Sequence, residues 1–521
     1  MYVPSQRPRR ISLPMISRSF RAPRALLSAL LIATAAPAAS LGQAAPNLAP
    51  RAALRATAPP TALAERIEAI LARPALRRAD WGIEVRDAAS GRVLYARNAD
   101  RLFIPASNLK LLVTATAAHH LGAGYRYRTT VYGTGPVRNG VLEGDLVLYG
   151  RGDPLISDRG GRRRTAVWEE LADSLLARGI RRVTGGVIAD DSYFEPAHVR
   201  PDWEAYDLRW WYAAPVGALG FNDNSVEVHI SPGQVGERAR VTWVPESDYV
   251  VVENRTVTVA SGRARTADLE RVEGTNRIRA YGQVPAGSGA DVEYFAVASG
   301  AEYAGVTFRE TLERRGISVG RRDVRVVADS TRSPAASATP LGTHVSDPLP
   351  QVIGPILLNS QNWIAETLLK TVGREVRGEG SWDAGLAVER EFLGRVVGID
   401  STDLRLRDGS GLSAGNLVTP RAFVRLLDYV NRTPEMAIVR ASLPVAAREG
   451  SLRSRFTDMP GRVAAKTGYI GNVDSLGGFV TTDQGRTVIF SIIANKSGQP
   501  SARMKAGIDD VVRAIATTPA P

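Results

Sequence analysis

Short alternating strands dominate the sequence from 127 to 344, whereas the segments on either side are richer in helix. The apolar residues of these strands follow a period of two, and glycine-rich turns separate them, which is typical of β modules. The flanking segments, 61–126 and 345–521, mix helical and strand patterns. The simplest architecture is therefore one α/β domain made of the two flanking segments and split by a β-rich insertion of one or two smaller domains.

An apolar, alanine-rich run at 111–121 carries its leucines and alanines at steps of three and four, and it stops at Gly122. This pattern predicts a buried helix, with Ser107 in its first turn and Lys110 one turn later on the same face. A desolvated lysine can take the proton of a serine hydroxyl and so create a nucleophile. A serine near a helix start is more often a cap, so the pair is weak support when taken alone.

Lysine is rare in this chain, with five lysines among 66 basic residues. Arginine cannot give up its proton in a protein, so a base or a tunable cation has to remain lysine. Two of the five lysines, Lys110 and Lys466, lie in short motifs that also contain hydroxyl residues. This scarcity strengthens the catalytic interpretation of both motifs.

The first 60 residues are predicted to contain a signal peptide and leader at 1–45 and an Ala/Pro-rich linker at 46–60. Six arginines and no acid precede an apolar core at 25–36, and Met15 is an alternative start. An uncleaved membrane anchor is the alternative, but the apolar run is shorter than the roughly 20 residues that a span needs. We expect an exported protein of the periplasm or another extracytoplasmic compartment, without a stable transmembrane segment after signal removal.

The formal charge of +13 invites a nucleic-acid interpretation. However, the arginines that follow the leader are scattered among acids and form no basic stripe with interleaved aromatic residues, so we expect no nucleic-acid partner. The chain has no cysteine, which excludes a thiol nucleophile, a disulfide framework and Cys-ligated zinc. We expect neither a metal nor another cofactor. Trp203, Trp210 and Trp211 suggest either a groove for a sugar or a peptide or core packing, and core packing is favoured.

Two further motifs and one glycine-rich loop follow in the second flanking segment. Ser360-Gln361-Asn362 begins an apolar helix, and Lys466-Thr467-Gly468 lies at the end of a predicted strand. The loop at 408–416 contains Gly-x-Ser-x-Gly around Ser413, which matches the nucleophile elbow of α/β-hydrolases. That fold needs a histidine after the serine, and all five histidines precede Ser413. We therefore interpret the loop as a turn beside the active site.

Ser-x-x-Lys, Ser-x-Asn and Lys-Thr-Gly, in this order, resemble the signature of penicillin-binding proteins and serine β-lactamases. The long interval between Ser107 and Ser360 narrows the resemblance to the D-alanyl-D-alanine carboxypeptidase/endopeptidase family of low-molecular-mass penicillin-binding proteins, which carries inserted domains there. The implied fold is an α/β, penicillin-binding or β-lactamase-like transpeptidase domain, with an antiparallel sheet and flanking helices. Further similar stretches are 152–154, 188–194, 212–215, 221–224 and 443–446.

The resemblance implies a role for each motif residue. Ser107 would be the acylated nucleophile, and Lys110 would deprotonate it. Ser360 would pass the proton to the leaving amine, with Lys466 keeping that network positive. Asn362 would orient Lys110 and bind the substrate amide.

The strand motif is expected to bind the substrate. Thr467, together with the lysine before it, would hold the terminal carboxylate, and Gly468 would let a ligand backbone approach closely. The oxyanion hole would consist of the backbone N–H groups of Ser107 and Tyr469. The family usually has a small or hydroxylated residue at the position of Tyr469, so the bulk of this ring is expected to narrow the site.

The resemblance implies a serine-type D-Ala-D-Ala carboxypeptidase that acts on peptidoglycan stem peptides and is inhibited by β-lactams. An endopeptidase reaction on peptidoglycan cross-links would share the acyl-enzyme route and stays open. Two alternatives also stay open: a penicillin-binding module with little catalysis, and a serine β-lactamase. Class A β-lactamases add an acid that activates the deacylating water and lack so large an insertion. Nothing in the sequence indicates an oligomeric state.

Overall fold

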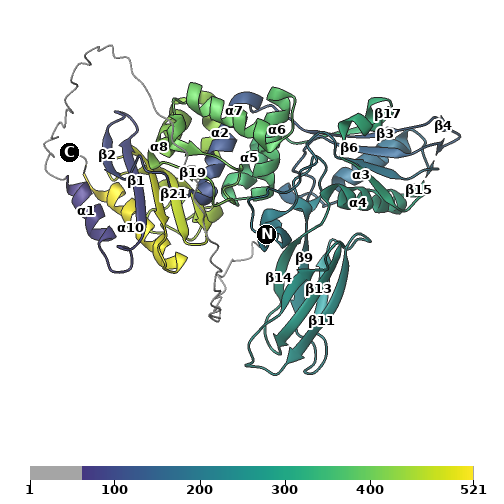
Figure 1. Cartoon of the computed structure of the whole chain (residues 1–521), viewed down its shortest axis with the longest axis horizontal. Helices are drawn as coiled ribbons and strands as arrows, with labels where there is room; N and C mark the ends of the chain where they lie inside the picture. Colours follow the sequence, from purple (N-terminus) through teal and green to yellow (C-terminus); the bar gives the residue numbers. More distant parts are fainter. Residues whose placement is uncertain (1–60, 520–521) are drawn as a thin grey trace, which may run out of the picture. The chain divides into compact units, whose positions relative to one another are not determined.

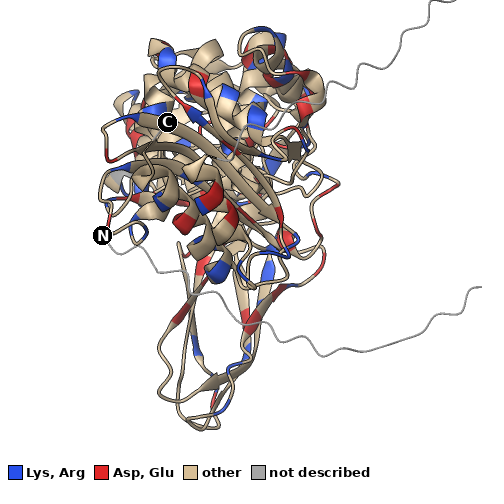
Figure 2. Cartoon of the chain, turned by 90° about the vertical axis from the view of Figure 1, so that its left-hand side faces the viewer, with Lys and Arg blue, Asp and Glu red and all other residues tan. Residues whose placement is uncertain are grey.

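The computed structural model describes residues 61–519 (Figure 1). The predicted signal peptide and leader at 1–45 and the predicted linker at 46–60 lie outside these residues. Between 61 and 519, no helix combines the length and the apolar character that crossing a membrane requires. Basic and acidic residues are interspersed along the ribbon (Figure 2), and arginines pair with carboxylates, as Arg455 does with Asp509.

A five-stranded antiparallel sheet joins the two ends of the described chain, in the strand order β2-β1-β22-β21-β20. β1 pairs along its whole length with β22, from Asp80 opposite Asn495 to Asp87 opposite Val488. The sheet therefore holds together residues that lie about 400 positions apart in sequence. Its strands are β1 (Asp80–Asp87), β2 (Val93–Arg97), β20 (Val463–Ile470), β21 (Val473–Thr481) and β22 (Thr487–Asn495).

Helices cover both faces of this sheet (Figure 1). Successive side chains of a strand point to opposite faces, and in β22 Phe490 packs with α1 and α10 while Ile489 packs with the helices of the other face. One face carries α1 (Ala62–Leu71) and α10 (Ser501–Thr517). The other cluster contains α2 (Lys110–Leu121), α5 (Leu349–Leu358), α6 (Asn362–Arg377), α7 (Trp382–Arg395), α8 (Pro420–Arg432) and α9 (Ala437–Ala441).

The segment from 127 to 344 is rich in strands, as predicted, and forms sheets of its own. A mixed five-stranded sheet has the order β16 (Val324–Val327), β8 (Val187–Asp190), β6 (Leu146–Gly150), β3 (Arg128–Gly133) and β17 (Thr339–Val345). Next to it are the short strands β15 (Ser318–Val319), β7 (Arg182–Val183), β5 (Val141–Leu142) and β4 (Val137–Arg138), with helices α3 (Ala166–Ala177) and α4 (Gly300–Arg314).

Two three-stranded sheets complete this segment. One consists of β10 (Arg240–Val244), β9 (Ser225–Ser231) and β14 (Asp291–Ala296), and the other of β11 (Val251–Val259), β13 (Arg277–Pro285) and β12 (Asp268–Arg271). A small pair, β18 (Leu404–Arg405) and β19 (Leu417–Val418), flanks the glycine-rich loop in the second flanking segment. Trp203 and Trp210 are buried, which agrees with the favoured core-packing interpretation, whereas Trp211 is partly exposed.

Three local predictions need correction. Ser107 lies in a 3₁₀ turn, Ala106–Leu109, directly before α2, and not in the first turn of the α-helix. Apolar residues at helical spacing from 352 to 372 favour a single helix, but the chain forms α5 and α6 there, because Ser360 adopts a positive φ of 61° that no α-helix permits. The Lys-Thr-Gly motif, predicted at the end of a strand, lies inside β20, which continues to Ile470.

Candidate active site

Lys110 is the first residue of α2 and is fully buried, yet its ammonium group meets three oxygens. Its Nζ lies 2.9 Å from Ser107 Oγ, 2.7 Å from Asn362 Oδ1 and 2.6 Å from the backbone oxygen of Ser410. The 3₁₀ turn and the first residue of α2 bring Ser107 and Lys110 together over three positions. The Ser-x-x-Lys and Ser-x-Asn motifs, far apart in sequence, thus meet at one amine.

The backbone around Ser107 is tightly constrained. Ala106 has a positive φ of 49°. Its carbonyl oxygen packs against Gly411 so closely that a Cβ atom on Gly411 would lie only 2.0 Å from it. Ser107 itself is partly exposed, while both its neighbours are buried. The turn therefore presents the hydroxyl at the surface of a rigid support, as a nucleophile requires.

Ser360 and Lys466 form a second pair. Ser360 occupies the break between α5 and α6, and its Oγ accepts a hydrogen bond of 2.9 Å from Lys466 Nζ. Lys466 is fully buried and also donates to the backbone oxygen of Thr467 at 2.7 Å. Its β20 strand contacts the Ser107 turn, because Gly468 leaves room for Pro105 O at 2.8 Å and Asn108 N at 3.1 Å from its Cβ position.

Gly468 thus has a packing role that the sequence did not suggest. A side chain there would collide with Ser475 Oγ, at 2.3 Å from the Cβ position, and with the turn that carries Ser107. Ser475 Oγ in turn donates a hydrogen bond of 2.7 Å to Pro105 O, which connects β21 to the same turn. A contact between the Gly468 backbone and a ligand stays a prediction.

Thr467 and Tyr469 point to the other side of β20 from Lys466, because side chains alternate along a strand. Thr467 Oγ1 donates a hydrogen bond of 2.8 Å to Ser451 Oγ. The Tyr469 ring is 55% exposed and lies against Lys505 of α10, with Nζ 5.2 Å from the ring centre. The ring thus lies beside α10 and on the same side of β20 as Thr467, and the narrowing of the site by this ring stays a prediction.

The buried position of both lysines lowers their basicity. Burial lowers the pKa of Lys110 to about 7, although the negative charges of Glu366 and Asp408 act against this shift. Burial and the nearby positive charge of Lys110 hold the pKa of Lys466 well below its usual range. A buried amine with a pKa near neutrality is suited to accept a proton in catalysis.

A family model described as the D-Ala-D-Ala carboxypeptidase 3 (S13) family matches residues 63–516. This chain belongs to that family. The enzyme is similar to a D-alanyl-D-alanine carboxypeptidase of Actinomadura sp. (strain R39), with 37% identity over 85% of this chain and 82% of the relative. It is also similar to the D-alanyl-D-alanine carboxypeptidase DacB of Haemophilus influenzae, with 24% identity over 78% of this chain and 84% of the relative.

Solved structures agree with the fold. The crystal structure of penicillin binding protein 4 from Haemophilus influenzae matches with a TM-score of 0.75 and 22% identity, covering 86% of this chain and 98% of that chain. The same protein complexed with a β-lactam matches with a TM-score of 0.72 and 21% identity, over 87% and 100%. The family match and the curated relatives confirm the predicted family and D-Ala-D-Ala carboxypeptidase activity, and the solved structures confirm the fold class.

Sequence reasoning missed the acids behind Lys110. Glu366 of α6 and Asp408 are both fully buried, and both lie close enough to affect the pKa of Lys110. Glu366 could have been noticed, since it lies four residues after Asn362 and so on the same face of the predicted helix. Ser413 is buried, and its Oγ donates to Asp202, so it is a structural residue of the loop.

Proposed function

We propose that this carboxypeptidase removes the terminal D-Ala from peptidoglycan stem peptides through an acyl-enzyme on Ser107. The observation that carries the proposal is the set of oxygens around Lys110. A neutral amine has two N–H donors and one lone pair. The amide oxygen of Asn362 and the carbonyl of Ser410 can only accept, so they take the two donors. The lone pair is left for the hydroxyl proton of Ser107, 2.9 Å away.

The chemistry runs in two steps. Lys110 takes the Ser107 proton while Oγ attacks the carbonyl of the penultimate D-Ala, and the backbone N–H groups of Ser107 and Tyr469 bind the oxyanion. The C–N bond breaks as Ser360 Oγ gives its proton to the leaving amine and takes up the proton that Lys110 received from Ser107, so Lys110 is neutral again and Lys466 keeps its charge. A water molecule, deprotonated by the same machinery, then cleaves the ester and regenerates the serine. Asn362 holds Lys110 in place and binds the substrate amide.

Lys466 serves as the counterion of the substrate. The resemblance implies that Lys466 keeps the proton network positive, and burial and the charge of Lys110 lower its pKa in the ligand-free chain. A carboxylate bound at Thr467 would favour the protonated amine, so Lys466 would gain its charge when the substrate arrives. The enzyme would then avoid holding two buried positive charges side by side while the site is empty.

The endopeptidase reaction belongs to the same proposal, because only the leaving amine differs. Support for β-lactam inhibition comes from the Haemophilus influenzae protein of the same fold that was solved with a β-lactam. Mass spectrometry of digested cell-wall fragments, before and after incubation, tests both reactions. Loss of terminal D-Ala indicates the carboxypeptidase, and loss of cross-linked dimers indicates the endopeptidase. A penicillin-binding module would change neither, and a β-lactamase would turn over benzylpenicillin rapidly instead.

The domain division is also a proposal. Strands from 61–126 and 345–521 share the central sheet, and strands within 127–344 form sheets of their own, which supports an inserted unit at 127–344. We further propose that residues 1–45 direct export of the enzyme to an extracytoplasmic compartment and are then removed. N-terminal sequencing of the secreted protein tests this: a first residue at or before Met15 contradicts cleavage.

The rate of acylation should rise with pH and reach half its maximum near pH 7. Only the neutral form of Lys110 can accept the Ser107 proton, and burial lowers the pKa of Lys110 to about 7. The reaction is therefore slow below that pH, where the amine is protonated, and fast above it. Stopped-flow measurement of acylation by a chromogenic β-lactam provides the profile. A rate that is flat from acid to neutral pH contradicts the assignment.

Thr467→Val should reduce kcat/KM for an acyl-D-Ala-D-Ala peptide by about tenfold to a hundredfold, the range expected for one hydrogen bond to a charged group. Valine keeps the shape and removes the hydroxyl that we assign to the substrate carboxylate. An analogue amidated at its C-terminus should be affected much less. Ser451→Ala is the matched control, because it removes the partner of Thr467 Oγ1 and leaves the donor in place. Equal losses on both substrates mean that Thr467 only supports the fold.

A further inference from the structure

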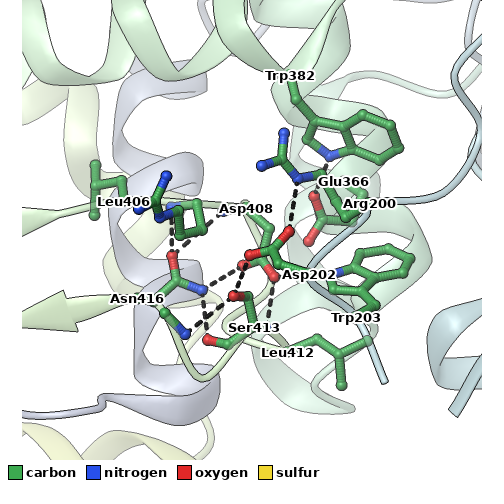
Figure 3. A network of polar contacts seen from close by, with 12 residues as sticks. Arg200, Asp202, Trp203, Glu366, Trp382, Leu406, Asp408, Leu412, Ser413 and Asn416 are labelled. Carbon is green, nitrogen blue, oxygen red and sulfur yellow. Dashed lines mark hydrogen bonds and ion pairs between the residues drawn. The ribbon is translucent and has the colours of Figure 1, made fainter. Parts of the chain in front are cut away.

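The loop at 408–416 carries the carbonyl that Lys110 contacts, and two buried carboxylates hold this loop (Figure 3). Asp408 lies at the centre of the view, between Asn416 and Ser413 on one side and Trp203 on the other, with Glu366 nearby. A glycine-rich segment of this kind has little conformational preference of its own. What fixes it must therefore come from its contacts.

Each of the two peptide planes beside Ser410 is bound by one carboxylate. Glu366 accepts a hydrogen bond of 2.7 Å from Ser410 N, which belongs to the peptide between Gly409 and Ser410. Asp408 Oδ1 accepts 2.8 Å from Gly411 N, which belongs to the peptide after Ser410. In a trans peptide the N–H and C=O bonds point in opposite directions. With its N–H directed at Asp408, the second peptide has to aim the Ser410 carbonyl the other way, toward Lys110.

We propose that Asp408 and Glu366 are positioning residues for the general base, because together they aim the Ser410 carbonyl at Lys110 and thereby direct its lone pair at Ser107. The inference rests on the proposed role of Lys110. Without the Ser410 acceptor, one N–H of the neutral amine has no assigned partner, and the lone pair is free to turn away from the serine.

The other oxygens of the two carboxylates are also hydrogen-bonded. Asp408 Oδ2 accepts 2.7 Å from Ser413 N and 3.0 Å from Trp203 Nε1, and Oδ1 accepts 2.8 Å from Asn416 Nδ2. Glu366 Oε2 accepts 3.0 Å from Gly409 N and 2.8 Å from Trp382 Nε1. Trp203 comes from the 127–344 segment, so that segment reaches the support of the base.

Both carboxylates also act on Lys110 through their charge, since each raises its pKa against the effect of burial. Other charged groups near this cluster are Lys466 of β20, Lys370 of α6 and Glu389 of α7, together with Asp202, which accepts from Ser413 Oγ and pairs with Arg200. Burial raises the pKa of Glu389 to about 8, so this acid is largely neutral at neutral pH. Glu389 is therefore a natural control: it is as buried as Glu366, and its carboxylate oxygens have no hydrogen-bond partner.

The test compares Glu366→Gln, Asp408→Asn and the control Glu389→Gln in the full chain, by the rate of benzylpenicillin acylation across acid to mildly alkaline pH. Asp408→Asn turns one acceptor oxygen into a donor that faces two other donors, so its maximal rate should fall by about tenfold to a hundredfold. Glu366→Gln likewise turns an acceptor oxygen into a donor that faces two donors, so its maximal rate should fall by a similar factor. In both variants the midpoint of the profile should move to lower pH, because a negative charge that favours the protonated amine is lost. The shift should be smaller in Glu366→Gln, because burial and Asp408 raise the pKa of Glu366 to about 7 and leave this acid only partly ionised at the midpoint.

The control should match the wild type in rate and midpoint. A loss of rate without a shift of the midpoint, or an equal loss in Glu389→Gln, would overturn the proposal, since general damage to the fold produces either result. Lys110→Arg is measured in parallel. If it still acylates, the role of the base is wrong; if it is inactive while Asp408→Asn and Glu366→Gln match the wild type, only the positioning proposal fails.

Trp203→Phe replaces the Asp408 variant if that variant does not fold. Phenylalanine keeps most of the ring and removes one donor to Asp408. Acylation slowed by about threefold to tenfold at an unchanged melting temperature supports the proposal, as the loss of one neutral hydrogen-bond donor predicts. A wild-type rate overturns it.

Discussion

Benzylpenicillin should add once to the wild-type chain, on Ser107, and Ser107→Ala should show no adduct and essentially no peptidase activity. Removing the nucleophile of a serine peptidase costs roughly a millionfold in turnover, because the remaining groups have nothing to activate. In this structure Ser107 is partly exposed at 2.9 Å from a buried amine. Intact-mass measurement gives the number of adducts, and peptide mapping gives the site.

Ser413→Ala is the matched control for this variant, since Ser413 is the other serine that matches a nucleophile motif in the sequence. Its Oγ is engaged with Asp202, and it has no lysine at its side in the structure. The Ser413 variant should therefore still form the adduct. Labelling of Ser413 in the wild type, or an adduct that persists in Ser107→Ala, would contradict the assignment of the nucleophile.

The relation of Ser107 to Lys110 could be predicted because it is local. A helical turn of either kind brings residues three apart to the same side, so the pair meets although the turn is 3₁₀ and not α. The order of the three motifs was equally informative about the family. Each motif is short and lies in a segment whose helix or strand could be predicted from its apolar residues. The strands of the central sheet were found for the same reason: alternating apolar residues mark β21 and β22 clearly.

The break at Ser360 could not be predicted from periodicity. Apolar residues continue at helical spacing on both sides of it, and the positive φ of Ser360 is stable only through what surrounds it. One such contact is the hydrogen bond from Lys466, a residue of β20 more than a hundred positions away. Tertiary contacts thus override a local pattern at the very residue that the second motif contributes.

The acids behind the base were missed for a related reason. Nothing in the sequence says that Glu366 and Asp408 would bind the two peptides beside one residue, because the arrangement exists only once α6 and the loop are packed together. The sequence could indicate that the loop is glycine-rich and lies near the site. The direction of a single carbonyl, which decides what Lys110 can do, depends on the folded structure.

Lys110→Arg should lower the rate of acylation by about a hundredfold to ten-thousandfold, the contribution expected of a general base. Arginine keeps a positive charge but cannot accept a proton at neutral pH. Its guanidinium group has no lone pair to offer to Ser107, even if it reaches Asn362 Oδ1. Lys110→Met should be as inactive as Lys110→Arg, because methionine approximates the shape of the lysine side chain but has no basic group. Benzylpenicillin acylation and the melting temperature are measured together.

Lys370→Arg separates the loss of the base from damage to the fold. Lys370 is as buried as Lys110, and its Nζ lies 3.7 Å from the Trp382 ring centre, where a guanidinium can also stack. It makes no contact with Ser107 in the structure, so this variant should acylate at close to the wild-type rate. Equal losses at both lysines would mean that a larger cation in this core is harmful wherever it is placed. A loss confined to Lys110 ties the chemistry to the one amine whose lone pair the surrounding oxygens direct at Ser107.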